Sequence, residues 1–528
     1  MPGTGHPLAD PPFQSVGALL DAHRRRAPDK AAIVDVEHHA TVSFGELAAV
    51  VDALGRQLQR HGARKGSRIV LASTEGLEKL LLWLGIWRIG AVACPLDIAF
   101  VGPDVAGKLL DMLDPSLILL PLEADASVVP RTNGRLVRFD TWPAGSANEN
   151  REDVIRFTAD SDESGTPFSF DIDIDLTDIA SMCCTSGTTG MPKVVVYDHA
   201  CYWLNGLDSI DLLGLNTADR ALEYRSFDWY SAQILSLMPF LQLGSTLCVA
   251  RRFSRSQFAG WIRDNRVTVC AGVPTVLNML LDSPVDVSGG SLASLRVMTC
   301  STAPLSPVQW ERFEAHYGIH VLNLYGSSEA GWMCGNRSQR RKLGTVGYPA
   351  AHIGFTIVSP DGSPCGPGQE GQVVVSGPKL ALGLLRADRS IEPLRGTALH
   401  TRDVASQDDE GFVRVSGRMD DLIIRGGVKI VPQEIEDALL AHAGVQDAVA
   451  LGVPDPIYGQ ESVCFVVPHP GSILDARELL THCRARLPRE KLPRHVYVVE
   501  SLPRSARGKI LRDALRREWW TITHAPGT

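Results

Sequence analysis

Predicted helices and strands alternate along much of this chain, and this alternation constrains the fold more than any other feature of the sequence. Residues 44 to about 60 place apolar side chains at helical spacing, whereas residues 68–72 and 90–96 are short apolar runs typical of buried strands. Strands separated by helices usually pair in parallel, so the pattern predicts βαβ units in an α/β protein. The alternation resumes after residue 193, with strands predicted at 245–249, 267–271 and 295–299.

The pattern changes in the later part of the chain. From about residue 343 to 415, short β segments alternate with turns such as 360–362 and 408–411, which predicts a small β-barrel or a distorted sheet. Residues from about 122 to 170 are polar and are interrupted by glycine and proline, so a variable loop region is expected there.

The C-terminal residues follow a compact α+β pattern. Helices are predicted at 432–441 and 476–486, and strands at 445–453 and 462–467. We predict a boundary near residues 417–420, which divides the chain into a large domain, residues 1–419, and a small domain, residues 420–528. The expected fold is therefore α/β, with two βαβ-type sheet subdomains and a small β-barrel-like subdomain in the large domain, followed by a small α+β domain.

A run of hydroxyl residues and glycines with one lysine lies between two predicted strands, residues 178–184 and 194–197. Small residues let backbone N–H groups approach an anion, hydroxyls donate hydrogen bonds, and lysine adds a point charge. The run therefore predicts a loop that binds a polyphosphate, although its spacing differs from a Walker A loop. The alternative is a Gly/Thr-rich hairpin turn. The candidate residues are Thr185, Ser186, Gly187, Thr188, Thr189, Gly190 and Lys193.

Composition excludes several classes of protein. The 528 residues exceed one ordinary core, so roughly two to four structural units are expected. The net charge of −8 and the absence of a basic stripe argue against nucleic acid as a partner. Eleven cysteines without any C-x-x-C pair indicate reduced thiols, and hence a cytoplasmic location, rather than disulfides or a zinc site.

No targeting or membrane segment is expected. The N-terminus lacks a basic segment followed by an apolar core, so no signal peptide is predicted. The most hydrophobic stretch, residues 80–87, is followed by Arg88 and falls short of the ~20 apolar residues of a membrane helix.

Four further segments carry side chains suited to nucleotide chemistry, in a fixed order after the loop. They are the Tyr-Gly-Ser-Ser-Glu run at 325–329, the Thr-Arg-Asp run at 401–403, which is predicted to end a strand, residues 417–427 followed by 432–436, and residues 503–512. With these motifs, nearly the whole chain resembles the adenylate-forming superfamily of acyl-CoA synthetases, peptide-synthetase adenylation domains and luciferases. It is most similar to stand-alone acyl- or aryl-CoA ligases.

The resemblance implies a reaction in two steps. A carboxylate attacks the α-phosphate of ATP bound with Mg²⁺, which gives an acyl-adenylate and pyrophosphate. The thiol of coenzyme A then takes the acyl group. It also implies a large and a small domain that meet over the active site, with a mobile small domain.

The resemblance assigns a role to each matching position. The loop holds the β- and γ-phosphates, Tyr325 packs on adenine, Ser328 contacts the α-phosphate, and Glu329 helps to bind Mg²⁺. A second group comprises Ser301 and Ala303 beside the adenine and acyl pockets, Asp403 with Arg418 at the ribose, Lys509 as the catalytic lysine, Gly426 and Gly427 beside the pantetheine arm, and Asp420 at the hinge.

Structural roles remain as alternatives at these positions. Lys509 could be a solvated lysine, Asp403 a turn cap, Glu329 a residue at a helix start, and Tyr325 a core side chain. His199 is predicted to pack or to hydrogen-bond rather than to catalyse.

The chain departs from the pattern of the family at several positions. Val194 and Arg402 stand where glycine is usual, and Ser328 replaces the commoner threonine. Residues 505–507, before Gly508, also differ from the more frequent spacing. None of these changes removes an atom that adenylation needs, but Arg402 stands beside the expected ribose site.

The acid pocket is expected around Phe227, Asp228, Trp229 and Tyr230. Peptide-synthetase adenylation domains often carry Phe-Asp there, where the carboxylate pairs with the amino group of an amino acid. The spacing from Asp228 to Gly244 is longer than in such domains, which disfavours an amino-acid substrate. The two larger aromatic residues suggest an aromatic or compact pocket, but both could equally be core.

The acceptor is less constrained than the activation step. Coenzyme A is the first expectation, because Gly426 and Gly427 would let a pantetheine arm pass close to the backbone. An amine in specialised metabolism or a separate carrier protein is the alternative, and no carrier domain follows in this chain. The rival hypothesis is a degenerate paralogue that binds a nucleotide without catalysing a reaction. The presence of Lys509, Glu329 and Asp403 argues against it. The acid and the oligomeric state stay undetermined.

Overall fold

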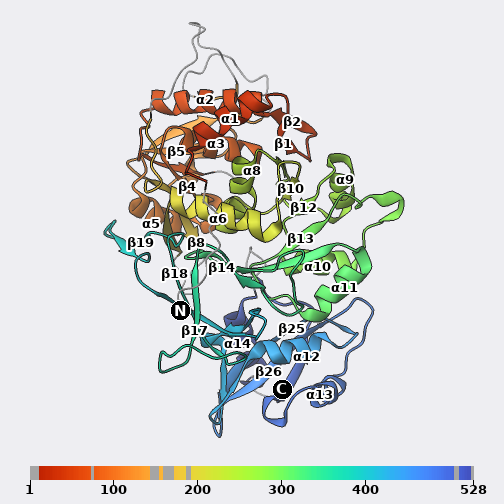
Figure 1. Cartoon of the computed structure of the whole chain (residues 1–528). Helices are drawn as coiled ribbons and strands as arrows, with labels where there is room; N and C mark the ends of the chain where they lie inside the picture. Colours follow the sequence, from red (N-terminus) through yellow and green to blue (C-terminus); the bar gives the residue numbers. More distant parts are fainter. Residues whose placement is uncertain are drawn as a thin grey trace.

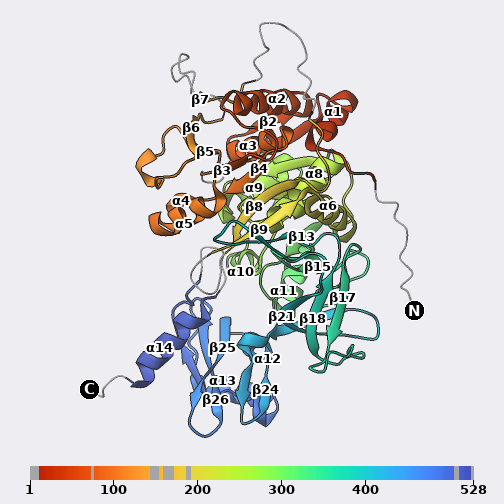
Figure 2. The same ribbon diagram turned by 90° about the vertical axis from the view of Figure 1, so that its left-hand side faces the viewer.

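The computed structural model describes residues 11–72, 76–142, 154–158, 172–185, 192–504 and 510–524. The described strands form four sheets, and the two largest lie in the N-terminal part of the chain (Figure 1). The C-terminal elements form a separate layer at the other end of the molecule from α1 and α2 (Figure 2).

The first large sheet contains the strands that flank the predicted phosphate loop. Its central strands β4, β3, β5 and β6 run parallel, as the predicted βαβ units require, whereas β8 and β9 pair antiparallel. In sheet order the strands are β20 (Ile391–Pro393), β19 (Gly383–Leu385), β9 (Lys193–Asp198), β8 (Ile179–Thr185), β4 (Val92–Pro95), β3 (Arg68–Leu71), β5 (Leu117–Pro121), β6 (Arg135–Phe139) and β7 (Val154–Ile155).

Two of these strands fall within residues 122–170, where only a variable loop was expected. Because β6 and β7 lie at the edge of the sheet, they bury only part of their side chains, and their sequence lacks a long apolar run. The prediction was therefore wrong for these two segments.

The second large sheet carries the other predicted strands. The adjacent strands β14, β13, β12, β10, β11 and β1 run parallel to one another. Strands β15 and β16 extend the sheet beyond β14 in antiparallel pairing. In sheet order the strands are β16 (Tyr348–Pro349), β15 (Gly331–Gly335), β14 (His320–Ser327), β13 (Val297–Cys300), β12 (Val269–Cys270), β10 (Arg220–Glu223), β11 (Thr246–Val249), β1 (Ala31–Asp35) and β2 (Ala40–Ser43).

Helices pack on these sheets as the periodicity predicted. Helix α2 has the expected bounds, Phe44–Arg60, because a capping box between Ser43 and Glu46 fixes its start. Helix α3 (Leu77–Arg88) lies against it, and Gly85 permits the close approach, since a Cβ there would come within 2.8 Å of Leu54 Cβ. The other helices here are α1 (Val16–Arg26), α4 (Ile98–Val101), α5 (Pro103–Leu113), α6 (His199–Leu213), α7 (Tyr230–Ala232), α8 (Met238–Leu243), α9 (Arg255–Asn265), α10 (Pro274–Asp282) and α11 (Pro307–Tyr317). Short 3₁₀ turns lie at Ala126–Val128 and Ser288–Gly290.

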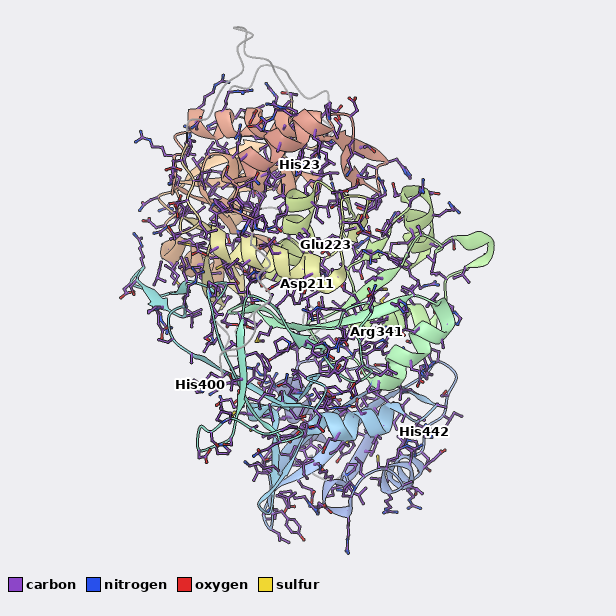
Figure 3. The ribbon with its side chains drawn as sticks, in the orientation of Figure 1. His23, Asp211, Glu223, Arg341, His400 and His442 are labelled. Atoms are coloured by element: carbon purple, nitrogen blue, oxygen red, sulfur yellow. The ribbon has the colours of Figure 1, made fainter. Side chains whose placement is uncertain are left out.

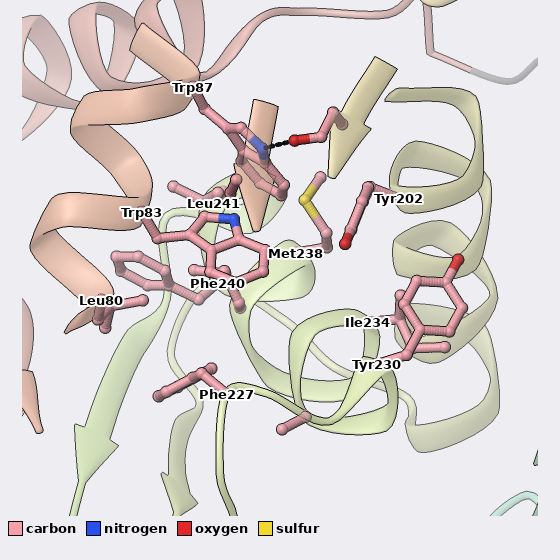
Figure 4. Packing of buried hydrophobic residues seen from close by; sticks show 14 of the residues in the cluster. Leu80, Trp83, Trp87, Tyr202, Phe227, Tyr230, Ile234, Met238, Phe240 and Leu241 are labelled. Carbon is pink, nitrogen blue, oxygen red and sulfur yellow. Dashed lines mark hydrogen bonds between the residues drawn. The ribbon is translucent and has the colours of Figure 1, made fainter. Parts of the chain in front are cut away.

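An aromatic core joins α3 to the elements that precede the candidate site (Figure 4). Trp83 and Trp87 are fully buried, and the indole of Trp87 donates a hydrogen bond to the Ala180 carbonyl of β8 at 2.8 Å. Each large apolar side chain buried in this way stabilises the fold by about 1.5–3 kcal/mol. The core therefore anchors the strand that leads into the phosphate loop.

The small β subdomain is an antiparallel sheet of β17 (Gly354–Val358), β18 (Gly371–Ser376), β21 (Leu399–Gln407) and β22 (Val413–Arg418). After a 3₁₀ turn at Met419–Asp421, the C-terminal residues form their own sheet and their own apolar clusters. Their elements are β23 (Ile423–Arg425), β24 (Val428–Ile430), α12 (Pro432–Leu440), β25 (Val445–Asp455), β26 (Gly459–Pro468), α13 (Ala476–Arg484), a 3₁₀ turn at Arg489–Lys491, β27 (His495–Val498) and α14 (Arg512–His524).

The predicted C-terminal elements are confirmed, with strands β25 and β26 longer than expected. Among the described residues, no helix has the length and apolar character needed to cross a membrane.

Candidate active site

The ends of the predicted phosphate loop are fixed by a pair of strands. β8 and β9 lie antiparallel, and Thr185 stands directly opposite Lys193 in their register. The chain therefore leaves the sheet and returns to it at neighbouring positions, with the Lys193 side chain exposed. The remaining predicted loop residues, Ser186, Gly187, Thr188, Thr189 and Gly190, lie outside the described residues.

Tyr325, Asp403 and Arg418 come together from three strands. The Tyr325 hydroxyl donates a hydrogen bond to Asp403 Oδ2 at 2.5 Å, and Arg418 Nε lies 3.5 Å from Asp403 Oδ1. Burial, and then the Asp403 carboxylate, raise the pKa of Tyr325, so its hydroxyl stays protonated and can donate. Asp403 lies in the interior of β21, opposite Arg418 on β22, whereas the sequence placed it at the end of a strand.

That misplacement has a local cause. Strand β21 continues beyond Asp403 because residues 404–407 pair with β22, including polar side chains that the sequence pattern did not mark as strand. In an antiparallel sheet with a solvated face, such residues are tolerated.

The backbone after Tyr325 is held from two sides. The Tyr197 hydroxyl, at the end of β9, donates a hydrogen bond to the Ser328 carbonyl at 2.8 Å, and the Ala381 N–H donates to the Glu329 carbonyl at 2.9 Å. The side chains of Ser328 and Glu329 remain partly exposed. Burial and neighbouring groups, Glu329 among them, raise the pKa of Tyr197, so its hydroxyl remains a donor.

Tyr197 was not singled out from the sequence. The only signal was its place at the end of a buried strand directly after the phosphate loop. In the structure its ring stacks on Tyr230, with centroids 4.0 Å apart and planes at 16°. Tyr197 thus connects the expected acid segment with the Ser328–Glu329 turn.

Ser301 follows β13 and is fully buried. Its hydroxyl lies 3.4 Å from Nη1 of Arg225, which itself forms a buried ion pair with Glu223 at 2.7 Å. Glu223, labelled in Figure 3, lies in the interior at the end of β10. This buried pair was also missed, because two charged residues beside an aromatic one gave no distinctive pattern.

The residues after Ser301 adopt a strained turn. Thr302 has a φ of +74°, a left-handed conformation that is costly for a β-branched residue, and Ala303 beside it is partly exposed.

The expected acid segment is only partly exposed. Phe227 and Tyr230 are almost fully buried, and Trp229 is half-buried. Tyr230 also exchanges hydrogen bonds with α6, since its hydroxyl donates to the Cys201 carbonyl at 3.2 Å. These contacts favour the core role that the sequence left open for Tyr230.

Gln233 fixes the loop that contains Phe227. Its buried amide donates to the Phe227 carbonyl at 2.6 Å and accepts from the Tyr202 hydroxyl at 2.7 Å. Gln233 begins a π-helical turn, Gln233–Leu237, a local widening of the helix that is often found at functional sites.

Gly426 and Gly427 form the turn between β23 and β24. Their φ values are +55° and +87°, as in a type I′ hairpin, and the Gly426 N–H donates to the Tyr458 carbonyl at 2.8 Å. The hairpin therefore requires these glycines, whatever else they do. Asp420 lies in the 3₁₀ turn at the predicted boundary, and Lys509 lies outside the described residues.

His199 is confirmed as a packing residue. It is buried against Phe13 and Trp87, and burial lowers its pKa to about 4. Within the described part of the chain, no group of three or more His, Cys, Asp or Glu side chains could hold a metal ion by itself.

Comparison with known proteins identifies the family of the two parts of the chain. The model of the AMP-binding enzyme family matches residues 20–385, and that of the AMP-binding enzyme C-terminal domain matches residues 434–509. A feruloyl-CoA synthase of Amycolatopsis sp. is 30% identical over 511 residues, which cover 96% of this chain and 99% of that protein. An indoleacetate–CoA ligase of Aromatoleum aromaticum is 30% identical over 508 residues, 94% of this chain and 97% of that protein.

Solved structures share the fold. An anthranilate CoA ligase in complex with anthranoyl-AMP superimposes with a TM-score of 0.83 at 22% identity, over 96% of this chain and 98% of that one. An o-succinylbenzoate CoA synthetase from Bacillus subtilis, in complex with its acyl-adenylate intermediate, gives a TM-score of 0.78 at 25% identity, over 95% of this chain and 98% of that one.

Proposed function

Because this chain belongs to the AMP-binding enzyme family, we propose that it is an AMP-forming ligase that activates a carboxylic acid with ATP and transfers the acyl group to coenzyme A. The observation that carries the proposal is the junction of Tyr325, Asp403 and Arg418 beside the partly exposed Ser328 and Glu329. An aromatic face, a hydrogen-bonded carboxylate, a hydroxyl and a second carboxylate are gathered there, which suits a nucleotide.

Each group at the junction has a separate task in this proposal. The ring of Tyr325 offers a face for adenine, and its hydroxyl holds Asp403 in place. The Asp403 carboxylate then accepts hydrogen bonds from the ribose hydroxyls, with Arg418 beside it. Lys193 and the preceding hydroxyl-rich loop bind the β- and γ-phosphates, which need donors and positive charge.

The first chemical step joins the acid to the α-phosphate. A carboxylate oxygen of the substrate forms a bond to the α-phosphorus, the bond from that phosphorus to the bridging oxygen breaks, and pyrophosphate leaves. Ser328 contacts the α-phosphate, and Lys509 from the small domain stabilises the charge that develops on its oxygens. Positioning and charge neutralisation supply most of the catalysis in such a transfer.

Mg²⁺ fits this site through Glu329. Its carboxylate is a hard oxygen ligand on a backbone that Tyr197 and Ala381 hold in place, and the remaining ligands would come from phosphate and water. When bound, the ion neutralises phosphate charge.

The second step captures the adenylate. The thiol of coenzyme A attacks the acyl carbon and loses its proton, AMP leaves, and a thioester forms. The turn at Gly426 and Gly427 has no side chains beyond hydrogen, so a pantetheine arm can approach its backbone.

The substrate class proposed is an aryl or arylalkyl carboxylic acid. Relatives named for feruloyl, indoleacetate and 2-succinylbenzoate substrates support an aromatic acid, as does the half-buried Trp229 beside the buried Phe227. A cytoplasmic location is part of the proposal, because both co-substrates are abundant there and all eleven cysteines are free thiols.

We further propose that residues 1–419 form the large domain and residues 420–528 the small one, with Asp420 at the hinge. The separate sheet and the separate apolar clusters of the C-terminal residues support this division.

The test is acid-dependent exchange of labelled pyrophosphate into ATP with Mg²⁺, over a panel of aryl, fatty and amino acids. Product mass spectrometry with coenzyme A, or with amines in its place, then identifies the acceptor. Folded protein that binds ATP but supports no exchange with any acid would refute the activation step. If an amide forms and no thioester is detected, the acceptor is an amine and not coenzyme A.

A further inference from the structure

Lys79 is a fully buried lysine on a helix whose other buried residues are mostly apolar. It lies on α3 between residues such as Leu77, Leu80 and Leu81, and none of its side chain is exposed. Its ammonium forms an ion pair with Oδ1 of Asp228. Breaking this ion pair would be strongly destabilising, because it would separate a fully buried ammonium from a charged partner.

Asp228 is the partner that faces outward. Its side chain is 18% exposed, in contrast to the fully buried Lys79. Its own N–H donates to the Ser226 hydroxyl at 3.0 Å, and the neighbouring Phe227 carbonyl is held by Gln233. The carboxylate therefore stands at a fixed place in the segment expected to bind the acid.

The segment that contains Asp228 also lies beside strand β8. Burial, and to a lesser degree the negative charge of Asp228, raise the pKa of the Cys183 thiol to about 11. Cys183 lies on β8, two residues before the start of the phosphate loop at Thr185. Gln233 supplies the geometric link, because its amide nitrogen lies 3.7 Å from the Cys183 sulfur and donates to the Phe227 carbonyl at 2.6 Å, which places the segment of Asp228 beside the strand that leads to the predicted phosphate loop.

We propose that Lys79 is a specificity-determining residue that neutralises Asp228 and so excludes α-amino acids from the acid pocket. The inference rests on the proposed function and names the substrate class more closely, as carboxylic acids without an amino group at the α-carbon. Lys79 acts through Asp228 and does not need to touch the substrate.

The physical argument is a balance of charges. A carboxylate can bind a substrate ammonium only if its own charge is available, and here Lys79 already compensates it. A second ammonium beside Asp228 would be attracted by the carboxylate but repelled by the Lys79 ammonium that already pairs with it, so the net attraction is reduced. Displacing Lys79 is not an alternative, since it would separate a fully buried ammonium from the carboxylate that pairs with it, which is strongly destabilising.

The experiment compares acids that differ only in the α-amino group: 3-phenylpropanoic acid with phenylalanine, and indole-3-propanoic acid with tryptophan. Pyrophosphate exchange gives kcat/KM for each acid with the full chain. The variants are Lys79→Met, which removes the ion pair with Asp228, and Lys79→Met combined with Asp228→Asn, which removes both charges. Lys65→Met is the matched control, because Lys65 pairs with Asp178 in a partly exposed site.

Wild-type protein should prefer the acid without the amino group at least 100-fold. Lys79→Met should reduce this ratio at least tenfold, the double variant should restore it, and Lys65→Met should leave it unchanged. An unchanged ratio in folded Lys79→Met, a reduced ratio that persists in the double variant, or a wild-type preference for the amino acids would overturn the proposal. Lys79→Gln replaces the methionine variant if that protein does not fold, as judged by circular dichroism.

Binding separates this inference from the proposed function. Acyl- and aminoacyl-sulfamoyl adenosines of the same pairs mimic the adenylate and require no chemistry, so calorimetry can rank them even if no acid supports exchange. If the preference for the acyl over the aminoacyl analogue changes among the variants as predicted for the acids, the role of Lys79 is upheld even if no acid supports pyrophosphate exchange. If neither analogue of a pair binds to the wild type, Asp228 does not lie in an acid pocket and the inference is wrong.

Discussion

Nη1 of Arg402 donates a hydrogen bond to Oδ2 of Asp420 at 2.8 Å, which links β21 to the turn at Met419–Asp421. From the sequence, Arg402 stood beside the expected ribose site in place of glycine. Successive side chains on a strand point to opposite faces, so Arg402 reaches the turn while Asp403 faces Tyr325. The substitution therefore leaves the candidate nucleotide site intact and adds a contact at the proposed hinge.

We expect Asp420→Pro to slow acyl transfer by 100-fold or more, about 2.7 kcal/mol, while adenylate formation stays within about tenfold of wild type. Proline fixes φ near −65° and so restricts the rotation that would bring first Lys509 and then Gly426 and Gly427 to the site. Single-turnover assays that time adenylate and thioester separately provide the measurement.

Asp420→Ala and Arg402→Ala are the controls for the lost contact. Both side chains are at least half exposed, so their pair contributes at most about 1 kcal/mol and both alanine variants should retain both rates. If Asp420→Pro lowers the rates of both steps equally, or lowers neither, Asp420 is not the hinge residue.

Replacing Lys509 by alanine should lower the adenylation rate by roughly 10²–10³-fold, about 3–4 kcal/mol, as for the loss of one preorganised transition-state donor. Affinity for a preformed adenylate analogue should change less than the rate. Lys491→Ala, which removes a lysine paired with Glu434 in the same domain, is the matched control. Near wild-type adenylation by the Lys509 variant would exclude this lysine from the first step.

The Asp403 carboxylate should determine how well the enzyme distinguishes ribose from deoxyribose. Asp403→Asn is expected to raise the KM for ATP by about 10–100-fold and to abolish the preference for ATP over 2′-deoxy-ATP, because a charge-assisted hydrogen bond is lost. Tyr325→Phe keeps the aromatic face but removes the donor to Asp403, so it should have a smaller effect on both quantities. An Asp403→Asn variant that keeps the full preference would place the ribose elsewhere.

Tyr197 is predicted to position the Ser328–Glu329 turn. Tyr197→Phe keeps the stacking on Tyr230 but removes the hydrogen bond to the Ser328 carbonyl, so stability should fall by about 0.5–1.5 kcal/mol. We expect kcat for adenylation to drop about tenfold and the Mg²⁺ concentration for half-maximal rate to rise, with the KM for the acid unchanged. If stability falls but neither kcat nor the Mg²⁺ dependence changes, Tyr197 has only a packing role.

His199 should make the protein sensitive to mild acid. Its folded pKa of about 4 lies below the ordinary value of 6.5, so the unfolded state binds the proton first as the pH falls. Stability is therefore unaffected above pH 6.5 and is lost between pH 6.5 and 4, by about 2 kcal/mol at pH 5. His199→Phe keeps the ring contacts with Phe13 and Trp87 and should remove that part of the loss. Urea unfolding of both proteins at pH 7 and pH 5 measures it, and an equal pH dependence would refute the assignment.

Local patterns predicted individual elements well. Helix α2 has the bounds expected from its periodicity, because the apolar spacing and the capping box act within a few residues of one another. The two strands around the phosphate loop, and the two helices and two strands expected between residues 432 and 486, were predicted for the same reason. Strands β6 and β7 were missed, since an edge strand needs little apolar surface.

Pairings between distant residues could not be predicted in this way. The sequence indicated that Tyr325 and Asp403 belong to one site, but not that the hydroxyl of one binds the carboxylate of the other across 78 residues. Likewise, Lys79 gave no signal beyond being one of three charged residues in a mostly apolar helix, and Asp228 resembled a residue that binds a substrate amine. Only the packing of α3 against the acid segment places these two charges together.

The sequence by itself determined the α/β class, the order of the motifs and the residue types suited to ATP and acid chemistry, because periodicity and composition are local properties. The tertiary structure decided which charges are compensated. Tyr197, Lys79 and Arg402 acquire their roles from partners on other elements of the fold, and burial makes those partners obligatory for the first two.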